Sequence, residues 1–121
     1  MTIQYWVNRF KYFHVKPWNG GAIQASFASG AGLGIELLND DRTPMELVVR
    51  VLQRCFGMRR HDAARTMLKI HTDGSAIVGY AAKDTAEQLV AHIAAEARKR
   101  GFPLQCRVTA AQPIIPPDAA R

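Results

Sequence analysis

Residues 33–110 predict a small single α+β domain with three helices packed on one face of a three-stranded antiparallel sheet. The chain has 121 residues, which is room for one domain. Its segments follow the order strand, helix, helix, strand, helix, strand, and polar clusters or glycines end most of them. We therefore expect a flexible N-terminal extension at 1–32, a folded core at 33–110 and a disordered tail at 111–121.

The first 32 residues differ from the rest in composition. Seven of the ten aromatic residues lie in the first 27 positions, and residues 1–32 carry three basic residues and no acid. Glycine, alanine and serine dominate residues 19–34, which is typical of a flexible linker. The end of the chain holds three prolines in residues 112–121 and predicts a frayed tail.

Residues 35–38 predict a short strand that stops at a polar cluster. A helix follows, with Thr43 as its N-cap, Pro44 at its first position and Glu46 completing a capping box. Gly57 ends it. The apolar residues at helical spacing are Leu47, Val48, Val51, Leu52, Cys55 and Phe56.

A second helix is expected from about Asp62 to Gly74, and residues 75–82 are apolar and partly β-branched, which predicts a strand. The residues expected on one face of this helix are Ala63, Ala64, Met67, Leu68 and His71.

Asp84 and Glu87 form a cap-and-box start for a third helix that continues to about Arg100 and closes at Gly101. The alternating residues 104–108 predict the last strand. The expected buried residues of the helix are Ala86, Val90, Ile93, Ala94 and Ala97.

Several classes of protein are disfavoured. The sequence has no run of 18 apolar residues that would span a membrane and no apolar core of a secretory signal. Cys55 and Cys106 have apolar neighbours, which favours two buried, reduced thiols. The four histidines lie at no metal-ligand spacing with cysteine, and no glycine-rich phosphate loop joins a strand to a helix. We expect neither an enzyme nor a cofactor.

The net charge of +6 raises the alternative of a nucleic-acid-binding protein. Its strongest support is a set of basic residues on the predicted helices: Arg50, Arg54, Arg59, Arg60, Arg98, Lys99 and Arg100. The same residues are compatible with ordinary solvated helix faces, and the sequence contains no known nucleic-acid motif.

The polar cluster at residues 39–41, Asn-Asp-Asp, is the most informative stretch. Such residues favour turns and helix starts, and most such clusters do no more. Here, however, the two predicted helices could bring apolar side chains together beside the cluster, with the imidazole of His71 at the rim. A primary ammonium group has three donors and no acceptor, so a set of oxygen and nitrogen acceptors would suit it. The facing residues would be Met45 and Val48 on one helix and Met67, Ile70 and His71 on the other.

Four segments resemble a known family. Residues 39–49, NDDRTPMELVV, resemble the NDD-x-TPMEFVV segment of the ClpS adaptors, and residues 51–56, VLQRCF, resemble their VLQ-x-FF. Residues 64–74 match A-x-x-ML-x-VH-x-x-G apart from Ile70, and residues 103–106 resemble part of HPLLC. The resemblance covers residues 35–110 in order, without a gap.

This resemblance implies an adaptor function. ClpS proteins bind proteins whose first residue is Leu, Phe, Tyr or Trp and deliver them to a ClpA- or ClpC-type AAA+ unfoldase for degradation by ClpP. It also implies a bacterial, cytoplasmic protein, and targeting to an organelle by the acid-poor N-terminal segment is a weaker alternative. The ribosomal protein domain with the same fold that contacts L12 lacks the NDD pocket, so the motifs argue against that reading.

The resemblance also assigns residues. Asn39, Asp41 and His71 match the positions that hold the free α-amino group, and Asp40 adds negative potential. Met45 matches the residue that excludes β-branched first residues. The positions that match the wall of the side-chain pocket are Thr43, Met45, Val48, Met67, Ile70 and Leu104.

The chain departs from the family pattern at several positions, which favours a divergent or second-copy member. Ile70 stands where valine is usual, Arg42 replaces a common aromatic residue, and Cys55 replaces a phenylalanine. Leu89 replaces a lysine implicated in docking to the unfoldase, whereas Asp84 still matches the acidic residue of that docking face.

Overall fold

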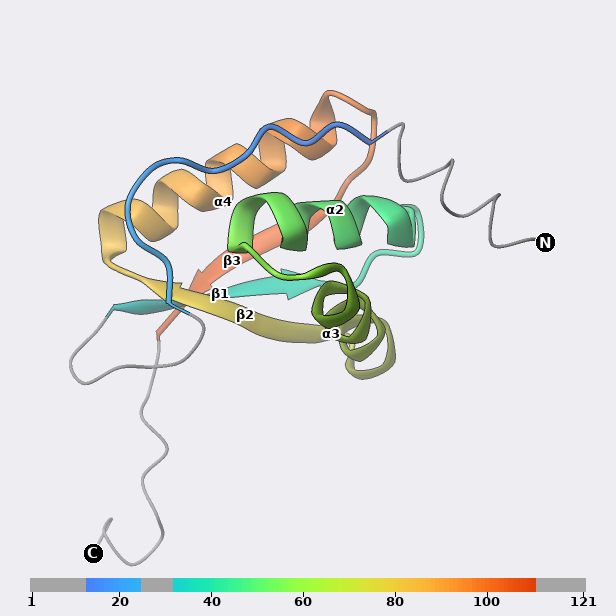
Figure 1. Cartoon of the computed structure of the whole chain (residues 1–121), viewed down its shortest axis with the longest axis horizontal. Helices are drawn as coiled ribbons and strands as arrows, with labels where there is room; N and C mark the ends of the chain where they lie inside the picture. Colours follow the sequence, from blue (N-terminus) through green and yellow to red (C-terminus); the bar gives the residue numbers. More distant parts are fainter. Residues whose placement is uncertain (1–12, 25–31, 111–121) are drawn as a thin grey trace, which may run out of the picture.

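The computed structural model describes residues 13–24 and 32–110 and confirms the predicted fold class. Three antiparallel strands in the order β2-β1-β3 carry three helices on one face (Figure 1). The predicted tail at 111–121 lies outside the described residues. The elements are β1 (Leu33–Leu38), α2 (Met45–Phe56), α3 (Arg60–Asp73), β2 (Ser75–Ala81), α4 (Lys83–Arg98) and β3 (Gln105–Thr109).

The two faces of the central strand β1 differ in polarity. Ile35 and Leu37 are fully buried, so their side chains belong to the face that the helices cover. Glu36 lies between them and forms an ion pair with Arg107 of β3, and it accepts a hydrogen bond from the hydroxyl of Ser75 at 3.0 Å. This alternation explains why only one face of the sheet binds helices.

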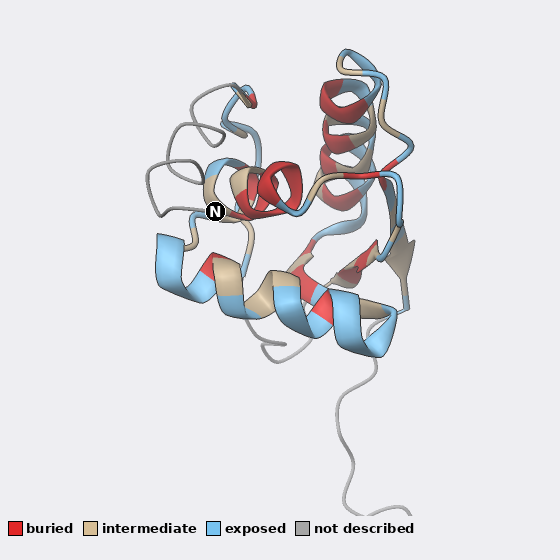
Figure 2. Cartoon of the chain, turned by 90° about the vertical axis from the view of Figure 1, so that its right-hand side faces the viewer, coloured by how far each residue is buried: buried red, intermediate tan, exposed pale blue. Residues whose placement is uncertain are grey.

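The helices stand side by side over the sheet. α3 contacts β2 and α4 contacts β3, while α2 contacts both other helices. Figure 2 shows buried residues along the inner sides of the helices and exposed residues along their outer sides. Consequently α2 has two lateral boundaries, one toward α3 and one toward α4.

The predicted ends of α2 and α3 are confirmed, whereas α4 ends at Arg98 with Lys99 as its C-cap, before the predicted end at Arg100. Two predicted starts are wrong. Gly57 and Gly74 end α2 and α3 with φ of 66° and 91°, left-handed angles that favour glycine. Pro44 is extended and occupies the N-cap position that was predicted for Thr43, and α4 likewise begins after Ala82 rather than at a cap by Asp84. Within the described residues, neither N-cap position has a side-chain hydrogen bond.

Two helix faces also differ from the prediction. Leu68 was expected on the inner face of α3, but its side chain is 52% exposed, and Ile70 is buried instead. On α4 the buried set includes Leu89 and Glu96, which the apolar pattern did not indicate. A segment outside the predicted core contacts α4 at Glu96, whereas Leu89 is part of the hydrophobic core.

That segment is residues 13–24, here called the N-terminal strap, and it contradicts the predicted flexibility of this part of the extension. The strap runs along α4 and then turns toward the sheet (Figure 1). The backbone N–H of Lys16 donates to Glu96 at 2.8 Å, and His92 Nε2 donates to the carbonyl of Lys16 at 2.7 Å. Trp18 N–H donates to the carbonyl of Arg54 on α2 at 3.1 Å. The strap therefore bridges α2 and α4.

Side chains of the strap complete the core. Val15 is 3% exposed, and the ring of Trp18 meets His92 edge-on at a centroid distance of 5.7 Å. At the end of the strap, Gln24 pairs with Tyr80 of β2 through two backbone hydrogen bonds of 2.8 and 2.7 Å. These contacts join residues that are more than 50 positions apart in the chain, which is why the local sequence pattern did not predict them.

Candidate functional site

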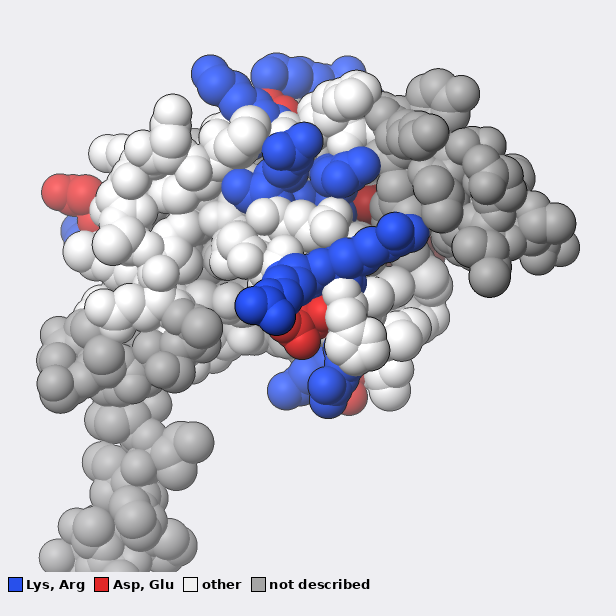
Figure 3. Space-filling model, viewed as in Figure 1, with Lys and Arg blue, Asp and Glu red and all other residues white. Residues whose placement is uncertain are grey.

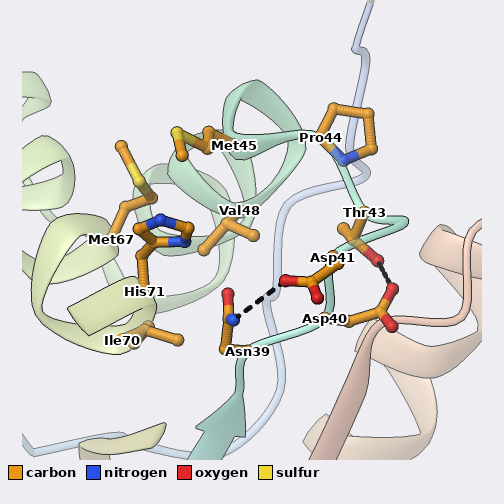
Figure 4. A pocket seen from close by; sticks show the side chains of 10 residues that line it. All are labelled: Asn39, Asp40, Asp41, Thr43, Pro44, Met45, Val48, Met67, Ile70 and His71. Atoms are coloured by element: carbon orange, nitrogen blue, oxygen red, sulfur yellow. Dashed lines mark hydrogen bonds between the residues drawn. The ribbon is translucent and has the colours of Figure 1, made fainter. Parts of the chain in front are cut away.

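A hollow of about 250 Å³ opens between α2, α3 and the turn that leads into α2 (Figure 4). The predicted meeting of two residues of α2 with three residues of α3 is confirmed. The residues that line the hollow are Asn39, Asp40, Asp41, Thr43, Pro44, Met45, Val48, Met67, Ile70 and His71. Pro44 was not predicted as a lining residue, although its place between Thr43 and Met45 could have indicated it.

The polar part of the rim consists of an amide, a carboxylate and an imidazole. The backbone N–H of Asn39 donates to the carbonyl of Gly74 at 2.8 Å, which ties the end of β1 to the end of α3. The side-chain amide of Asn39 lies 3.5 Å from a carboxylate oxygen of Asp41. Asn39, Asp41 and His71 are all exposed, and Figure 4 shows them gathered around one side of the hollow.

Asp40 faces a different partner. The hydroxyl of Thr43 donates to Asp40 Oδ2 at 2.7 Å, and the Thr43 N–H donates to the Asp40 carbonyl at 3.1 Å. The carboxylate of Asp40 is thus directed toward Thr43 and away from the Asn39 side chain (Figure 4). These two bonds hold the turn that presents Asp41.

The apolar part of the hollow has a buried floor and an open mouth. Ile70 is 2% exposed and Val48 is buried, whereas Met45 is 37% exposed at the start of α2. Met67 is half-buried and packs against the core. A ligand that enters this hollow would meet a flexible methionine first and branched, immobile side chains at the bottom.

Two residues expected at functional surfaces lie in the core. Leu104 is buried and borders a separate hollow with Leu38 and Ala94 on the side of α4, because it leads into β3 at the opposite edge of the sheet from α3. Leu104 is not among the residues that line the hollow between α2 and α3, so its assignment to the side-chain pocket stays a prediction. Leu89 is 0% exposed, so its side chain offers no docking surface, whereas Asp84 is exposed in the first turn of α4.

The cysteines are poor nucleophiles. Burial raises the pKa of Cys55 to about 12, and burial together with the nearby Cys55 and Glu36 raises the pKa of Cys106 to about 12. Both thiols are free and stay protonated at neutral pH. Among the described residues, no group of three His, Cys, Asp or Glu side chains could hold a metal ion, and no helix is long and apolar enough to cross a membrane.

Comparison with known proteins identifies the family of this chain. The model of the family described as "ATP-dependent Clp protease adaptor protein ClpS" matches residues 34–107, more than half of the chain. The chain belongs to the ClpS family. This match contains all ten lining residues of the hollow and none of the N-terminal strap.

Curated ClpS proteins and one solved ClpS structure support this assignment. The chain is 47% identical over 72 residues to the ClpS adapter protein of Paracidovorax citrulli, with 60% of this chain and 59% of that protein covered. It is 49% identical over 70 residues to the ClpS adapter protein of Nitrosospira multiformis, with 58% and 69% covered. The structure of Agrobacterium tumefaciens ClpS2 bound to L-phenylalaninamide matches with a TM-score of 0.63 and 34% identity, over 65% of this chain and 95% of that one.

Proposed function

We propose that this ClpS-family protein binds the free N-terminus of proteins that start with Leu, Phe, Tyr or Trp, and that it does so in the hollow between α2 and α3. The observation that carries the proposal is the combination of hydrogen-bond acceptors at the rim with a buried apolar floor formed by Val48 and Ile70. An N-terminal residue of this kind presents one ammonium group next to one large apolar side chain.

The rim suits the ammonium group. Its three N–H donors require three acceptors, which the amide oxygen of Asn39, the carboxylate of Asp41 and a ring nitrogen of His71 provide. The bond to Asp41 is charge-assisted and is the strongest of the three. Asp40 contributes negative potential and, through Thr43, holds the turn in place.

The floor suits the side chain. An aromatic ring or a leucine side chain that enters an apolar hollow gains roughly 2–3 kcal/mol from burial. Ile70, where the family usually has valine, narrows the bottom of the hollow slightly. Met45 lies at the mouth of the hollow, where it would exclude first residues that are branched at Cβ.

The ligand of the solved relative supports the same chemistry. L-phenylalaninamide, bound by ClpS2 of Agrobacterium tumefaciens, has a free amino group, a phenyl side chain and an amide in place of the next peptide bond. It therefore resembles the first residue of a protein that starts with Phe.

The second half of the proposal is that the chain delivers the bound protein to an unfoldase of the Clp protease. The family description names an adaptor of the Clp protease, and we assign the partner as the N-domain of a ClpA- or ClpC-type unfoldase that feeds ClpP. Asp84 is available for docking and Leu89 is not. A cytoplasmic, bacterial location stays a prediction, as does the absence of a catalytic activity.

Fluorescence anisotropy with a labelled Phe-led peptide tests the first half. A dissociation constant in the micromolar range or below, about −8 kcal/mol or better, is expected at pH 7. The same peptide with an acetylated N-terminus loses the positive charge and should bind at least 100-fold more weakly. Equal binding of both peptides would contradict the proposal.

The alternatives of a nucleic-acid-binding or ribosome-associated module differ in salt dependence. Their affinity should fall steeply between 50 and 200 mM salt, by about 10³-fold for six phosphate contacts, because counterions are released. Capture of one amino group with a buried side chain should weaken only a few-fold over that range.

A further inference from the structure

Two thioethers border the hollow between α2 and α3. Met45 is the first residue of α2, and Met67 lies in the middle of α3. Figure 4 shows how the two side chains line the hollow from its two helices. Peroxides convert methionine to a polar sulfoxide, which disrupts the apolar contacts that the residue makes. The wall of the hollow therefore contains two groups that an oxidant can make polar.

The methionines differ in their access to solvent. Among residues 13–24 and 32–110, Met45 is the only methionine whose side chain is exposed, with 37% of its surface accessible. Met58 and Met67 are half-buried and pack against the core, and Met1 lies outside the described residues. An oxidant in solution therefore reaches Met45 before the other two.

The thiols of the chain compete poorly for an oxidant. Peroxides react with a thiolate, and burial raises the pKa of both Cys55 and Cys106 to about 12, so both stay protonated at neutral pH. Cys55 is in addition only 3% exposed. Among the described residues, the sulfur atom most open to a mild oxidant is thus the one at the mouth of the hollow.

The charge of the surface does not bias this reaction. Figure 3 shows Lys and Arg side chains over the face of the molecule on which Figure 1 places α2 and α3. Hydrogen peroxide is uncharged at neutral pH, so these side chains neither attract nor repel it. Access to the sulfur atom decides which methionine reacts first.

A sulfoxide at position 45 would change the chemistry of the mouth. Val48 and Met67, which line the hollow together with Met45, have no side-chain hydrogen-bond donor. When an apolar side chain fills the hollow, water leaves this wall. The sulfoxide oxygen would then lose its hydrogen bonds to water without gaining a donor, which disfavours the bound state.

We propose that Met45 is a redox modification site, and that its oxidation by hydrogen peroxide weakens the capture of protein N-termini. The inference rests on the proposed function, because the hollow must hold the first residue. In the reaction, the sulfur gives two electrons to the peroxide, the O–O bond breaks, one oxygen forms the S=O bond and the other leaves as water. A reductase that uses two thiols reverses the step, because the sulfoxide oxygen leaves as water and the thiols form a disulfide.

The test measures the affinity of a labelled Phe-led peptide for the full chain before and after treatment with a limiting amount of hydrogen peroxide. Mass spectrometry of proteolytic fragments locates the added oxygen. We expect Met45 to be oxidised before Met58 and Met67, and the affinity to fall about tenfold as Met45 is converted. Methionine sulfoxide reductases for both epimers, supplied with a dithiol, should restore the affinity.

Three variants localise the effect, each compared with itself before and after treatment. Met45→Leu has no sulfur at the mouth, so its affinity should change less than about twofold. Met58→Leu is the matched control, because Met58 does not line the hollow, and it should lose affinity as the parent does. Met45→Gln places an uncharged polar group at the mouth and should bind about tenfold more weakly than Met45→Leu without any peroxide.

A bound peptide should also protect the modification site. A saturating amount of the Phe-led peptide should slow the oxidation of Met45, whereas the same peptide with an acetylated N-terminus should not. The oxidation rate of Met58 should be the same with either peptide.

The outcomes separate the inference from the proposed function. If the affinity is unchanged after conversion of Met45, and the acetylated peptide stays unbound, the inference is overturned and the proposed function stands. Oxidation of Met67 or of a cysteine before Met45 also overturns the inference. If the untreated chain binds no Phe-led peptide, the proposed function fails and the inference fails with it.

Discussion

The two sides of α2 show opposite solutions to the same packing problem. Toward α3, a hollow of about 250 Å³ stays open, with exposed polar groups at its rim. Toward α4, the chain bridges the two helices with its own N-terminal strap and buries Val15 there. An amphipathic helix normally closes both sides against neighbours. The chain covers the side of α2 toward α4 and leaves the side toward α3 open. A bound ligand explains this open side better than packing does.

The family match divides the two sides in the same way. It begins at residue 34, so it includes the whole hollow and excludes the strap. The hollow is thus part of what this chain shares with other ClpS proteins, and the strap lies outside it. Changes on the strap side should accordingly affect stability, and changes at the hollow should affect binding.

The largest effect on stability is expected for Leu89→Lys. Leu89 is fully buried, and an ammonium group placed there would be unpaired, so we expect a loss of at least about 3 kcal/mol in the free energy of unfolding. Urea denaturation measures it. Leu89→Met should cost less than about 1.5 kcal/mol, and Met45→Lys, at the open mouth of the hollow, should stay within about 0.5 kcal/mol. A Leu89→Lys variant as stable as the parent would show that Leu89 is not buried in the core.

Val15→Ala tests the strap directly. Val15 is 3% exposed, and removal of two buried methyl groups should lower the free energy of unfolding by about 2 kcal/mol. Lys16→Ala is the control, because Lys16 binds Glu96 and His92 through its backbone and its side chain is not needed for those bonds. The affinity for a Phe-led peptide should be unchanged in both variants; a tenfold loss in Val15→Ala would connect the two sides of α2.

The pH dependence of stability tests the anchor of the strap. Burial raises the pKa of Glu96, but the hydrogen bond from the Lys16 backbone and the charges of Lys99 and Arg100 outweigh it, so the pKa is lowered overall. Since the folded state holds the proton more weakly than the unfolded state, Glu96 stabilises the fold above the ordinary carboxyl pKa of about 4.3. This contribution is lost as the pH falls through the folded-state value. Glu96→Gln should cost about 1–3 kcal/mol at pH 7 and flatten the decline below pH 5, as measured by denaturation at a series of pH values.

The smallest effect is expected at the floor of the hollow. Ile70→Val removes one methyl group and should favour the largest ligand, so the affinity for a Trp-led peptide should rise about threefold relative to a Leu-led one. Anisotropy with the two peptides measures the ratio. An unchanged ratio would mean that the side chain of the first residue does not reach Ile70.

The sequence predicted the hollow better than the strap, for physical reasons. Residues 39–48 form a turn and a helix start whose geometry is local, and glycines with left-handed φ angles end both α2 and α3. The strap depends on the hydrogen bonds of Lys16 with His92 and Glu96, whose sequence separations are 76 and 80 residues. The periodicity of the sequence does not predict contacts of this kind. The burial of Glu96, which accepts the bond from Lys16, was missed along with the strap.

The helix starts show a similar limit. A threonine followed by proline and glutamate is compatible with a capping box, but the Thr43 hydroxyl binds the nearby Asp40 and the helix begins after Pro44. Leu68 looked like a core residue because it fits the spacing of α3, yet only part of that helix faces the sheet. The hydrogen-bond partner of the Thr43 hydroxyl and the width of the face of α3 that packs on the sheet both depend on the folded structure. The local sequence pattern therefore does not predict them.

The most direct test of the central claim is the affinity of one Phe-led peptide for three variants. Asp41→Ala and His71→Ala should each weaken binding, Asp41→Ala by at least 100-fold, because the ammonium group loses its charge-assisted acceptor at the rim of the hollow. Val15→Ala, on the covered side of α2, should bind like the parent. Unchanged affinity in Asp41→Ala would contradict the assignment of the open hollow as the site that holds a protein N-terminus.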